Sequence, residues 1–165
     1  MKMKIIVMSD SHGSMFNVRA LFSMHPDADM YLHLGDGCEN FADYCCQKGM
    51  PYAAVKGNCD FYSGAPSKEV VTVDGKRIFM SHGHLYGVKR STEEIINAGR
   101  EEDADIILFG HTHEPLCEYI DPGDGGKPLY LINPGSIAQP RSGNPTYALI
   151  TTQRGKILPN IAFLY

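Results

Sequence analysis

The stretch Lys4-Ile5-Ile6-Val7-Met8-Ser9-Asp10-Ser11-His12 is an apolar run that ends in two candidate metal ligands, Asp10 and His12. The apolar part shows no alternation with polar residues, which predicts a strand buried on both faces of its sheet. Gly13 breaks the strand, and apolar residues then recur at helical spacing, which predicts a helix over about residues 15–24. Asp10 and His12 are therefore expected in a loop between a buried strand and a helix.

The same order of strand and helix continues up to residue 60. Strands are predicted over residues 30–34 and 52–55, and the helix between them is expected to end at Gly49. Each strand runs into a loop with glycine and a further candidate ligand, Asp36 in the first loop and Asn58 in the second. Right-handed β-α-β connections give parallel strands, and loops at the carboxyl ends of parallel strands meet at one edge of the sheet.

The second half of the chain predicts strands that are partly antiparallel. Residues 70–80 read as a hairpin with an Asp74-Gly75 turn, and Ser91 with Glu94 forms a capping box that predicts a helix to about residue 101. Further strands are predicted at residues 106–109, 116–120, 129–132, 147–151 and 156–163. We therefore expect an α/β fold, a four-layer α-β-β-α sandwich of two mixed β-sheets flanked by helices. We expect one domain over residues 1–165.

Composition restricts the function classes. The chain has 165 residues, 43% hydrophobic and 21% charged, with a formal net charge of −4. It can form a sizeable core, and it has no basic field that would recruit nucleic acid. We expect no signal peptide before the first strand, and no stretch is apolar enough for a membrane span. Five cysteines without a Cys-x-x-Cys pair favour reduced thiols and a cytoplasmic location. A homodimer is compatible with the sequence, although no patch indicates one.

Two His-x-His pairs, His82-Gly83-His84 and His111-Thr112-His113, each follow an apolar run. About 0.3 such pairs are expected by chance from seven histidines in 165 residues. Taken singly, the candidate ligands have ordinary structural interpretations, such as a helix cap for Asp10 or a turn for Asp36. Taken together, five successive strand ends finish in glycine-rich loops with Asp, Asn or His, and one binuclear metal centre explains all of them.

These five loop motifs, in this order, resemble the calcineurin-like metallophosphoesterase superfamily. The motifs are Asp10-Ser11-His12, Gly35-Asp36, Gly57-Asn58-Cys59-Asp60, His82-Gly83-His84 and Gly110-His111-Thr112-His113. The compact spacing and the later segment Asn133-Pro134-Gly135-Ser136 are similar to its small YfcE-like phosphodiesterase branch, which also includes the retromer scaffold subunit. The resemblance runs from residue 4 to about residue 150. It implies a metal-dependent hydrolase that acts on phosphate esters.

The resemblance also implies two metal ions bridged by Asp36. The first ion would be bound by Asp10, His12, Asp36 and His113, and the second by Asp36, Asn58, His82 and His111. Carboxylate, amide and imidazole donors suit Mn²⁺, which we expect first, with Ni²⁺, Fe²⁺, Zn²⁺ and Mg²⁺ as alternatives. Such a pair lowers the pKa of the water that it shares. We therefore expect in-line attack of a metal-bridging hydroxide on phosphorus, without a covalent enzyme intermediate.

Residues beside these ligands are candidates for catalysis and substrate binding. Asp36, Asn58 and His84 are the candidate catalytic residues, and Asn58, His84 and Cys59 are the candidate substrate contacts. The wider superfamily usually has, at the position of Cys59, a His that can protonate the leaving group. A thiol with an ordinary pKa of about 8.5 is a poorer acid, which favours aryl esters, whose leaving groups need no proton. Cys59 could still assist as an acid, or it could be an inert spacer. Without a His at position 59, Asp60 loses the imidazole partner that the resemblance implies and is expected to orient a different histidine.

Two alternatives come from other functional classes. The first is a protein-interaction scaffold of the retromer-subunit type, with little or no hydrolysis. The second is a non-haem iron oxygenase, which needs two His and one carboxylate around a single iron, fewer donors than this chain offers. The predicted ligands serve monoesters and diesters equally, so the expectation of a small phosphodiester substrate rests on the branch resemblance alone.

Overall fold

The computed structural model describes residues Met1–Tyr165 and contains two five-stranded β-sheets that pack face to face. The first sheet contains, in spatial order, β10 (Lys156–Phe163), β9 (Thr146–Gln153), β1 (Lys2–Met8), β2 (Met30–His33) and β3 (Tyr52–Ala54). The second contains β4 (Lys68–Val73), β5 (Lys76–Ser81), β6 (Ile106–Leu108), β8 (Leu129–Pro134) and β7 (Pro115–Ile120). Both sheets combine parallel and antiparallel pairs.

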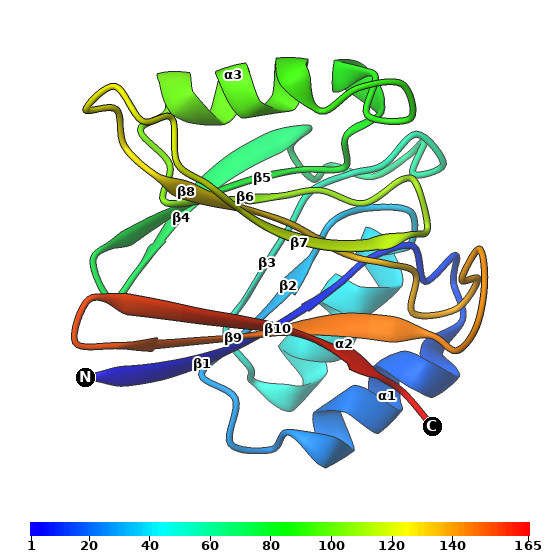
Figure 1. Cartoon of the computed structure of the whole chain (residues 1–165). Helices are drawn as coiled ribbons and strands as arrows, with labels where there is room; N and C mark the ends of the chain where they lie inside the picture. Colours follow the sequence, from blue (N-terminus) through cyan, green and yellow to red (C-terminus); the bar gives the residue numbers. More distant parts are fainter.

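Three α-helices cover the two outer faces of this pair of sheets. Helices α1 (Met15–Met24) and α2 (Cys38–Lys48) lie against the first sheet, and α3 (Glu93–Glu101) lies against the second (Figure 1). The predicted four-layer α-β-β-α sandwich is therefore confirmed. None of these helices has the length and apolar character needed to cross a lipid bilayer.

Strand β1 lies in the interior of the first sheet, between β9 and β2. Ile5 and Val7 point into the apolar layer between the two sheets, whereas Ile6 and Met8 point toward α1 and α2. All four side chains are fully buried. Both faces of β1 are covered, which explains why its apolar run does not alternate with polar residues. The predicted burial of this strand on both faces is confirmed.

Most predicted boundaries agree with the structure to within one or two residues, but the start of α3 does not follow the predicted capping box. The residue that precedes this helix is Thr92, and Ser91 accepts a hydrogen bond from the backbone N–H of Glu93, two residues away, at 3.2 Å. This is a local Ser turn one residue before the helix rather than the reciprocal pair of Ser91 with Glu94. The predicted hairpin turn is confirmed, since Asp74 and Gly75 have φ values of 50° and 74°, as a tight hairpin requires.

The direction of the strands places the functional loops. Strands β1, β2 and β3 are mutually parallel, and β5 is parallel to β6. Their carboxyl ends all point to one side of the molecule, on the right in Figure 1. The first sheet is mixed because β9 and β10, from the end of the chain, complete it in antiparallel fashion. The five loops with the sequence motifs therefore meet at one end of the interface between the sheets.

Candidate metal centre

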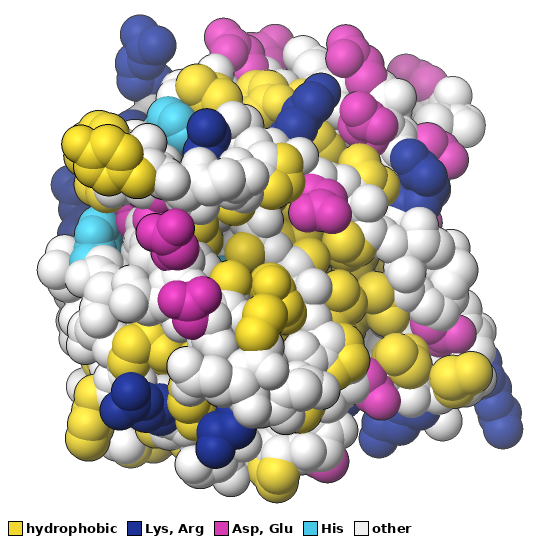
Figure 2. All heavy atoms as spheres, turned by 180° about the vertical axis from the view of Figure 1, so that it is seen from behind, with side chains coloured by type: hydrophobic (Ala, Val, Ile, Leu, Met, Phe, Trp, Pro, Cys, Tyr) yellow, Lys and Arg dark blue, Asp and Glu magenta, His cyan; other side chains and the backbone are white.

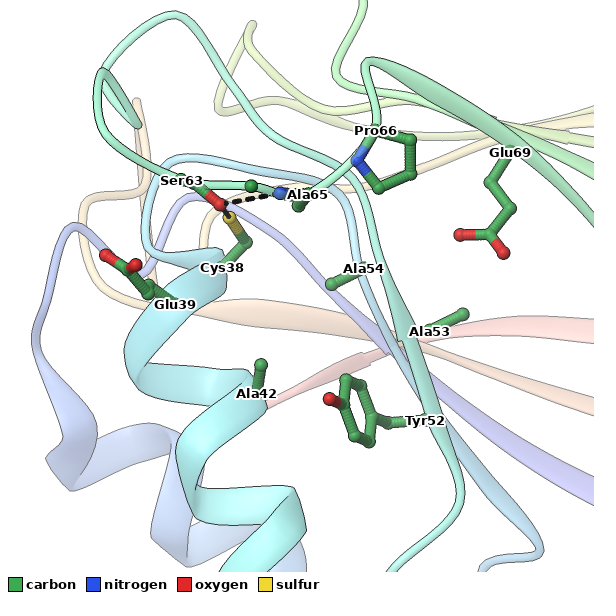
Figure 3. Close-up of a pocket in the computed structure, with 11 residues that line it drawn as sticks. Cys38, Glu39, Ala42, Tyr52, Ala53, Ala54, Ser63, Ala65, Pro66 and Glu69 are labelled. Atoms are coloured by element: carbon green, nitrogen blue, oxygen red, sulfur yellow. Dashed lines mark hydrogen bonds between the residues drawn. The ribbon is translucent and has the colours of Figure 1, made fainter.

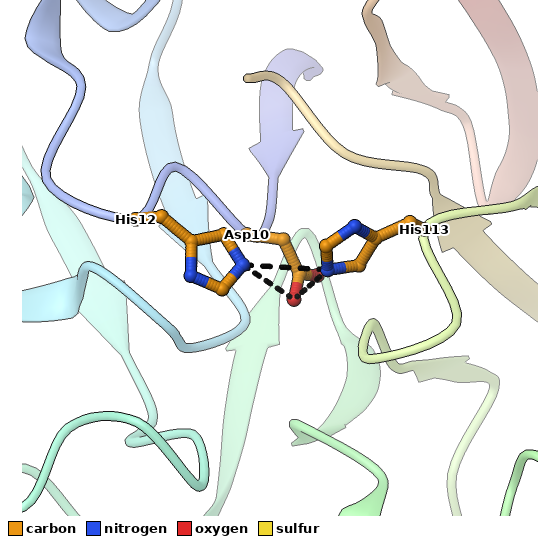
Figure 4. Close-up of side chains that lie close together, drawn as sticks. All are labelled: Asp10, His12 and His113. Carbon is orange, nitrogen blue, oxygen red and sulfur yellow. Dashed lines mark hydrogen bonds and ion pairs between the residues drawn. The ribbon is translucent and has the colours of Figure 1, made fainter. Parts of the chain in front are cut away.

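The loops after β1 and β6 bring together the first group of donors, Asp10, His12 and His113. His113 Nε2 lies 3.1 Å from Asp10 Oδ1 and 3.3 Å from His12 Nε2, and His12 Nε2 lies 3.8 Å from the same carboxylate oxygen. Figure 4 shows both imidazole rings turned toward the Asp10 carboxylate from opposite sides. Two nitrogens and one oxygen thus converge on one point.

The loops after β2 and β5, with that after β6, bring together the second group, Asp36, His82 and His111. His82 Nε2 lies 3.3 Å from Asp36 Oδ2 and 3.2 Å from His111 Nδ1. The side-chain oxygen of Asn58, from the loop after β3, is 3.1 Å from His82 Nε2 and completes this group. The oxygen and nitrogen atoms of the second group therefore also face one another.

The two groups are adjacent. His12 Nε2 is 4.0 Å from Asp36 Oδ2, and His82 Nε2 is 3.9 Å from Asp10 Oδ1. Asp36 also belongs to a third cluster, in which its carboxylate, His12 and the Cys59 thiol lie within 4.8 Å of one another. All seven predicted ligands thus lie in one continuous cluster, and Asp36 is close to donors of both groups.

The tautomers of two histidines suit metal binding. His82 Nδ1 lies 2.8 Å from the carbonyl oxygen of Leu34, and His113 Nδ1 lies 2.7 Å from that of Gln139. A carbonyl oxygen only accepts, so each Nδ1–H must donate, and in the neutral ring the lone pair is left on Nε2. Both Nε2 atoms face the cluster, which is the arrangement that outer hydrogen bonds impose on metal-binding histidines.

The electrostatics of the cluster also fit a cation. Burial opposes the ionised forms of Asp36 and Asp10, yet the close imidazoles of His82, beside Asp36, and His113, beside Asp10, lower both pKa values below the ordinary range. The pKa of His113 is raised, chiefly by Asp10, and the pKa of His82 is raised by Asp36 against the effect of burial. Asp10 Oδ1 is buried and accepts no hydrogen bond. A buried carboxylate oxygen without a hydrogen-bond donor, among imidazole lone pairs, is the donor set of a divalent cation.

The backbone of the cluster is strained. Eight residues other than glycine have positive φ, and five of them are predicted metal ligands. These are Asp10, His12, Asp36, His111 and His113, with φ between 47° and 70°. Left-handed backbone costs an ordinary residue about 1 kcal/mol or more and persists where the surroundings impose it, as at functional sites.

Comparison with known proteins assigns the family. A family model described as the calcineurin-like phosphoesterase superfamily domain matches residues 3–155, most of the chain. The chain belongs to this superfamily. It is 33% identical over 153 residues to a probable metallophosphoesterase, YsnB, of Bacillus subtilis, with 92% of this chain and 85% of that protein covered. It is 28% identical over 168 residues to phosphodiesterase YfcE of Escherichia coli, with 87% and 84% covered.

A solved structure supports the same assignment. A predicted phosphoesterase from Streptococcus pneumoniae superposes with a TM-score of 0.82 at 31% identity, and the match covers 99% of this chain and 90% of that one. Similarity over nearly the whole length of both chains shows that the α-β-β-α sandwich is the fold of the calcineurin-like superfamily. The resemblance inferred from the five motifs is thereby confirmed at the level of the family.

Within this phosphoesterase fold, Asp60 has a different role from the one expected. Its carboxylate accepts hydrogen bonds from the backbone N–H groups of Asp36, Gly37 and Gly57, at 2.7, 2.8 and 2.8 Å. The expectation that Asp60 orients a histidine is therefore wrong, because its hydrogen-bond partners are backbone N–H groups and no histidine is among them. Asp60 instead joins the loops after β2 and β3. Those loops touch, since a Cβ built on Gly35 (φ 105°) would lie 2.6 Å from the backbone nitrogen of Gly57.

Two residues that support the ligand loops have no metal motif of their own. His33 is fully buried, its Nδ1 accepts the N–H of Gly35 at 3.0 Å, and its Nε2–H then donates to Ser11 Oγ at 2.9 Å. Burial lowers the pKa of His33 to about 4, so the ring is neutral at pH 7. The signal in the sequence was an imidazole inside an otherwise apolar strand.

Asn133, on β8, has the equivalent role in the second sheet. Its Nδ2 donates to Gly110 O at 3.1 Å and to Thr112 Oγ1 at 2.9 Å, and its Oδ1 accepts the N–H of Gly135 at 2.9 Å. Ser136 Oγ donates to the carbonyl oxygen of Asp10 at 2.8 Å. The Asn133-Pro134-Gly135-Ser136 segment therefore connects the loops that carry Asp10, His111 and His113.

His84 and Cys59 lie at the border of the cluster. The His84 ring centroid is 5.4 Å from that of His82 and 6.1 Å from that of His111, and its buried Nδ1 has no hydrogen-bond partner. Cys59 is exposed, and its backbone N–H donates to Asp36 Oδ1 at 2.8 Å. Partial burial and the neighbouring Asp36 raise the pKa of its thiol, which keeps the proton on sulfur at neutral pH. The substrate contacts expected of His84 and Cys59 stay predictions.

Proposed function

We propose that this protein is a metal-dependent phosphodiesterase with a binuclear centre. The ligands would be Asp10, His12, Asp36, Asn58, His82, His111 and His113, with Asp36 shared between the two ions. The observation that carries the proposal is the convergence of five separate loops on two adjacent donor groups, with the Nε2 lone pairs of His82 and His113 turned toward them. Metallophosphoesterases and phosphodiesterases among the relatives support the same reaction class.

When bound, the two divalent ions would neutralise charge on the phosphate and lower the pKa of the attacking water. The residues of this chain hold and orient that centre. The carbonyl oxygens of Leu34 and Gln139 fix the tautomers of His82 and His113. The hydrogen bonds of the Asp60 carboxylate, called here the Asp60 clamp, keep Asp36 beside the loop that carries Asn58. No Ser, Thr or Cys hydroxyl or thiol is needed as nucleophile, so hydrolysis would proceed without a phosphoenzyme.

The test uses metal-depleted protein reloaded with Mn²⁺, Ni²⁺, Fe²⁺, Zn²⁺ or Mg²⁺ and assayed with bis(4-nitrophenyl) phosphate. We expect hydrolysis that needs added metal, two ions per chain by elemental analysis, and loss of both with Asp36→Asn. Asp43→Asn, on the exposed face of α2, is the matched control and should leave both intact.

Three results would overturn the proposal. Absence of hydrolysis with every ion would favour the scaffold alternative. One tightly bound iron per chain, and no second ion, would favour an oxygenase. A trapped phosphorylated protein would contradict direct attack by water.

Finer parts of the proposal are that Mn²⁺ is the native ion and that Asn58 and His84 contact the substrate. A cytoplasmic location and a single domain over residues 1–165 belong to it as well. Replacement of His84 by Asn is the sharpest of these tests, since a substrate contact would raise KM or lower kcat without loss of bound metal. Unchanged kinetics would remove His84 from the site.

A further inference from the structure

A cavity of about 320 Å³ opens beside the candidate metal centre. On its inner side it is lined by His12, Asp36 and Cys59. On its outer side it is lined by Phe61 and Tyr62, which follow Cys59 in the same loop. These two aromatic side chains are 82% and 97% exposed, so they pack against almost nothing in the protein itself. One cavity thus touches both the predicted ligands and a pair of unpartnered aromatic rings.

The charge of this cavity restricts its occupant. No Lys or Arg lines it, whereas Glu39, Asp60 and Asp36 do. A phosphomonoester carries close to two negative charges at neutral pH, and the cavity offers no side-chain cation for the second. A phosphodiester carries one charge, and its second ester arm is uncharged. The cavity therefore suits a diester whose retained arm, the one that does not leave, lies away from the metals.

A second space, lined largely by small side chains and by Glu39 and Glu69, adjoins the first. A pocket of about 420 Å³ shares Glu39 and Ser63 with the cavity and is walled by Ala42, Ala53 and Ala54. Figure 3 shows Cys38, Glu39 and Ser63 together at one end of this pocket, and Ser63 Oγ lies 3.3 Å from Cys38 Sγ. Small side chains leave room there for a flat group. Seen from behind, the surface shows hydrophobic side chains next to histidines at the left edge of the molecule (Figure 2).

We propose that Phe61 and Tyr62 determine substrate specificity, by stacking on an aromatic retained arm of a phosphodiester, such as an aryl group or a nucleoside. The alanine-walled pocket receives the far end of a larger arm. This inference rests on the proposed function, because the arm is held only while the phosphate sits at the metal centre. Aromatic faces bind flat rings without reading their hydrogen bonds, which gives a preference for aromatic arms rather than for one base.

The test varies only the retained arm and keeps 4-nitrophenol as leaving group. The substrates are bis(4-nitrophenyl) phosphate, thymidine 5′-(4-nitrophenyl phosphate) and methyl 4-nitrophenyl phosphate, with Mn²⁺-loaded full-length protein. The measured quantity is kcat/KM for each aromatic arm divided by that for methyl. We expect Phe61→Ala with Tyr62→Ala to lower this ratio about tenfold, mainly through KM, since stacking on one ring contributes about that factor.

Two control substitutions separate stacking by Phe61 and Tyr62 from other effects of losing an exposed ring. Phe16→Ala removes an equally exposed ring (83%) that lines neither space, and its ratio should equal that of the wild type. Ala42→Leu, which narrows the pocket, should lower the ratio for the thymidine arm more than for the single aryl ring. Both substitutions are checked for folding by circular dichroism.

The outcomes are distinguishable. If the wild type hydrolyses all three diesters and the double variant keeps the wild-type ratio, the specificity role is wrong and the phosphodiesterase proposal stands. An equal fall of the ratio in Phe16→Ala would also overturn it. If no diester is hydrolysed with any ion, the proposed function itself fails.

Discussion

The loops of the first sheet and those of the second contribute different chemistry to the cluster. The first sheet supplies both carboxylates, and its loops are joined to one another through Asp60 and through the contact of Gly35 with Gly57. The second sheet supplies His82, His111 and His113, whose positions depend on bonds to other segments. His82, for example, is oriented by Leu34 O at the end of a first-sheet strand.

This difference indicates that Asp36 is held by loops of its own sheet, whereas the orientation of His82 depends on how the two sheets dock. Damage to a carboxylate should therefore abolish the centre, and damage to one imidazole should weaken it. Substitutions in each sheet therefore have different expected effects.

Asp36→Asn should have the largest effect. Asp36 lies within reach of both donor groups, so we expect metal-dependent hydrolysis to fall about a thousandfold or more, with loss of both ions. His111→Asn removes one donor of one group and should cost about tenfold to a hundredfold in metal affinity. Titration calorimetry with Mn²⁺ and the diester assay measure both. Equal losses in the two variants would contradict the proposed sharing of Asp36.

The buried His33 should make the first half of the site sensitive to acid. Its folded pKa of about 4 lies below the ordinary 6.5, so the unfolded chain binds a proton that the folded chain does not. The contribution of His33 to the free energy of unfolding is fully present above pH 6.5 and is lost as the pH falls toward 4. The total loss is about 3 kcal/mol for a fully buried ring. Urea unfolding of metal-free protein from pH 7.5 to 4 measures it.

His33→Asn keeps an acceptor for the Gly35 N–H but cannot titrate, so its stability should depend less on pH across that window. The lowered pKa of His111 acts in the same direction over this window, and the raised pKa values of His82 and His113 act with the opposite sign. Both proteins contain these groups, so the difference between wild type and variant isolates His33. Parallel curves for the two proteins would show that His33 does not titrate as its burial requires.

Asp60→Ala tests the clamp between the first-sheet loops. It leaves three backbone N–H groups without their charged acceptor, and we expect a loss of about 2–3 kcal/mol and a Tm lower by about 5–10 °C. Asn133→Ala, the counterpart in the second sheet, removes bonds between neutral groups and should cost less, about 1–2 kcal/mol. Calorimetry on metal-free protein compares them. A larger loss for Asn133→Ala would reverse the contrast between the sheets.

Cys59→His should have the smallest effect. An imidazole at this position can protonate a leaving group, so turnover of alkyl esters should rise about tenfold, with little change for aryl esters. Cys46→His, an exposed cysteine on α2, is the control. Unchanged turnover of poor leaving groups would show that the thiol is not what limits the reaction.

The site was predictable where the signal was local. Each strand without alternation, each turn with glycine and each of the five motifs consists of a few consecutive residues, so they predicted the elements, the sandwich and the residues of the cluster. Family resemblance added the pairing of donors, which spacing alone does not give. The loops meet because the parallel strands direct their carboxyl ends to one side, a rule that needs no coordinates.

The supporting contacts were not predictable in this way. Asp60 reaches backbone groups more than twenty residues away, and its role depends on a close approach of two loops that only the folded chain has. His33 looked like an isolated polar residue in a strand, and its bond to Ser11 follows from the registration of β1 with β2. Ser91 failed as a cap because side-chain and backbone turns compete at helix starts.

The left-handed backbone at five predicted ligands lowers the stability of the fold at the residues that are expected to bind metal. A glycine in place of His12 would relax its φ of 47° and stabilise the metal-free fold, while a donor nitrogen disappears. Selection of variants for heat resistance alone would therefore remove this centre first. A screen for more thermostable variants of the protein therefore needs to measure bound metal as well as Tm.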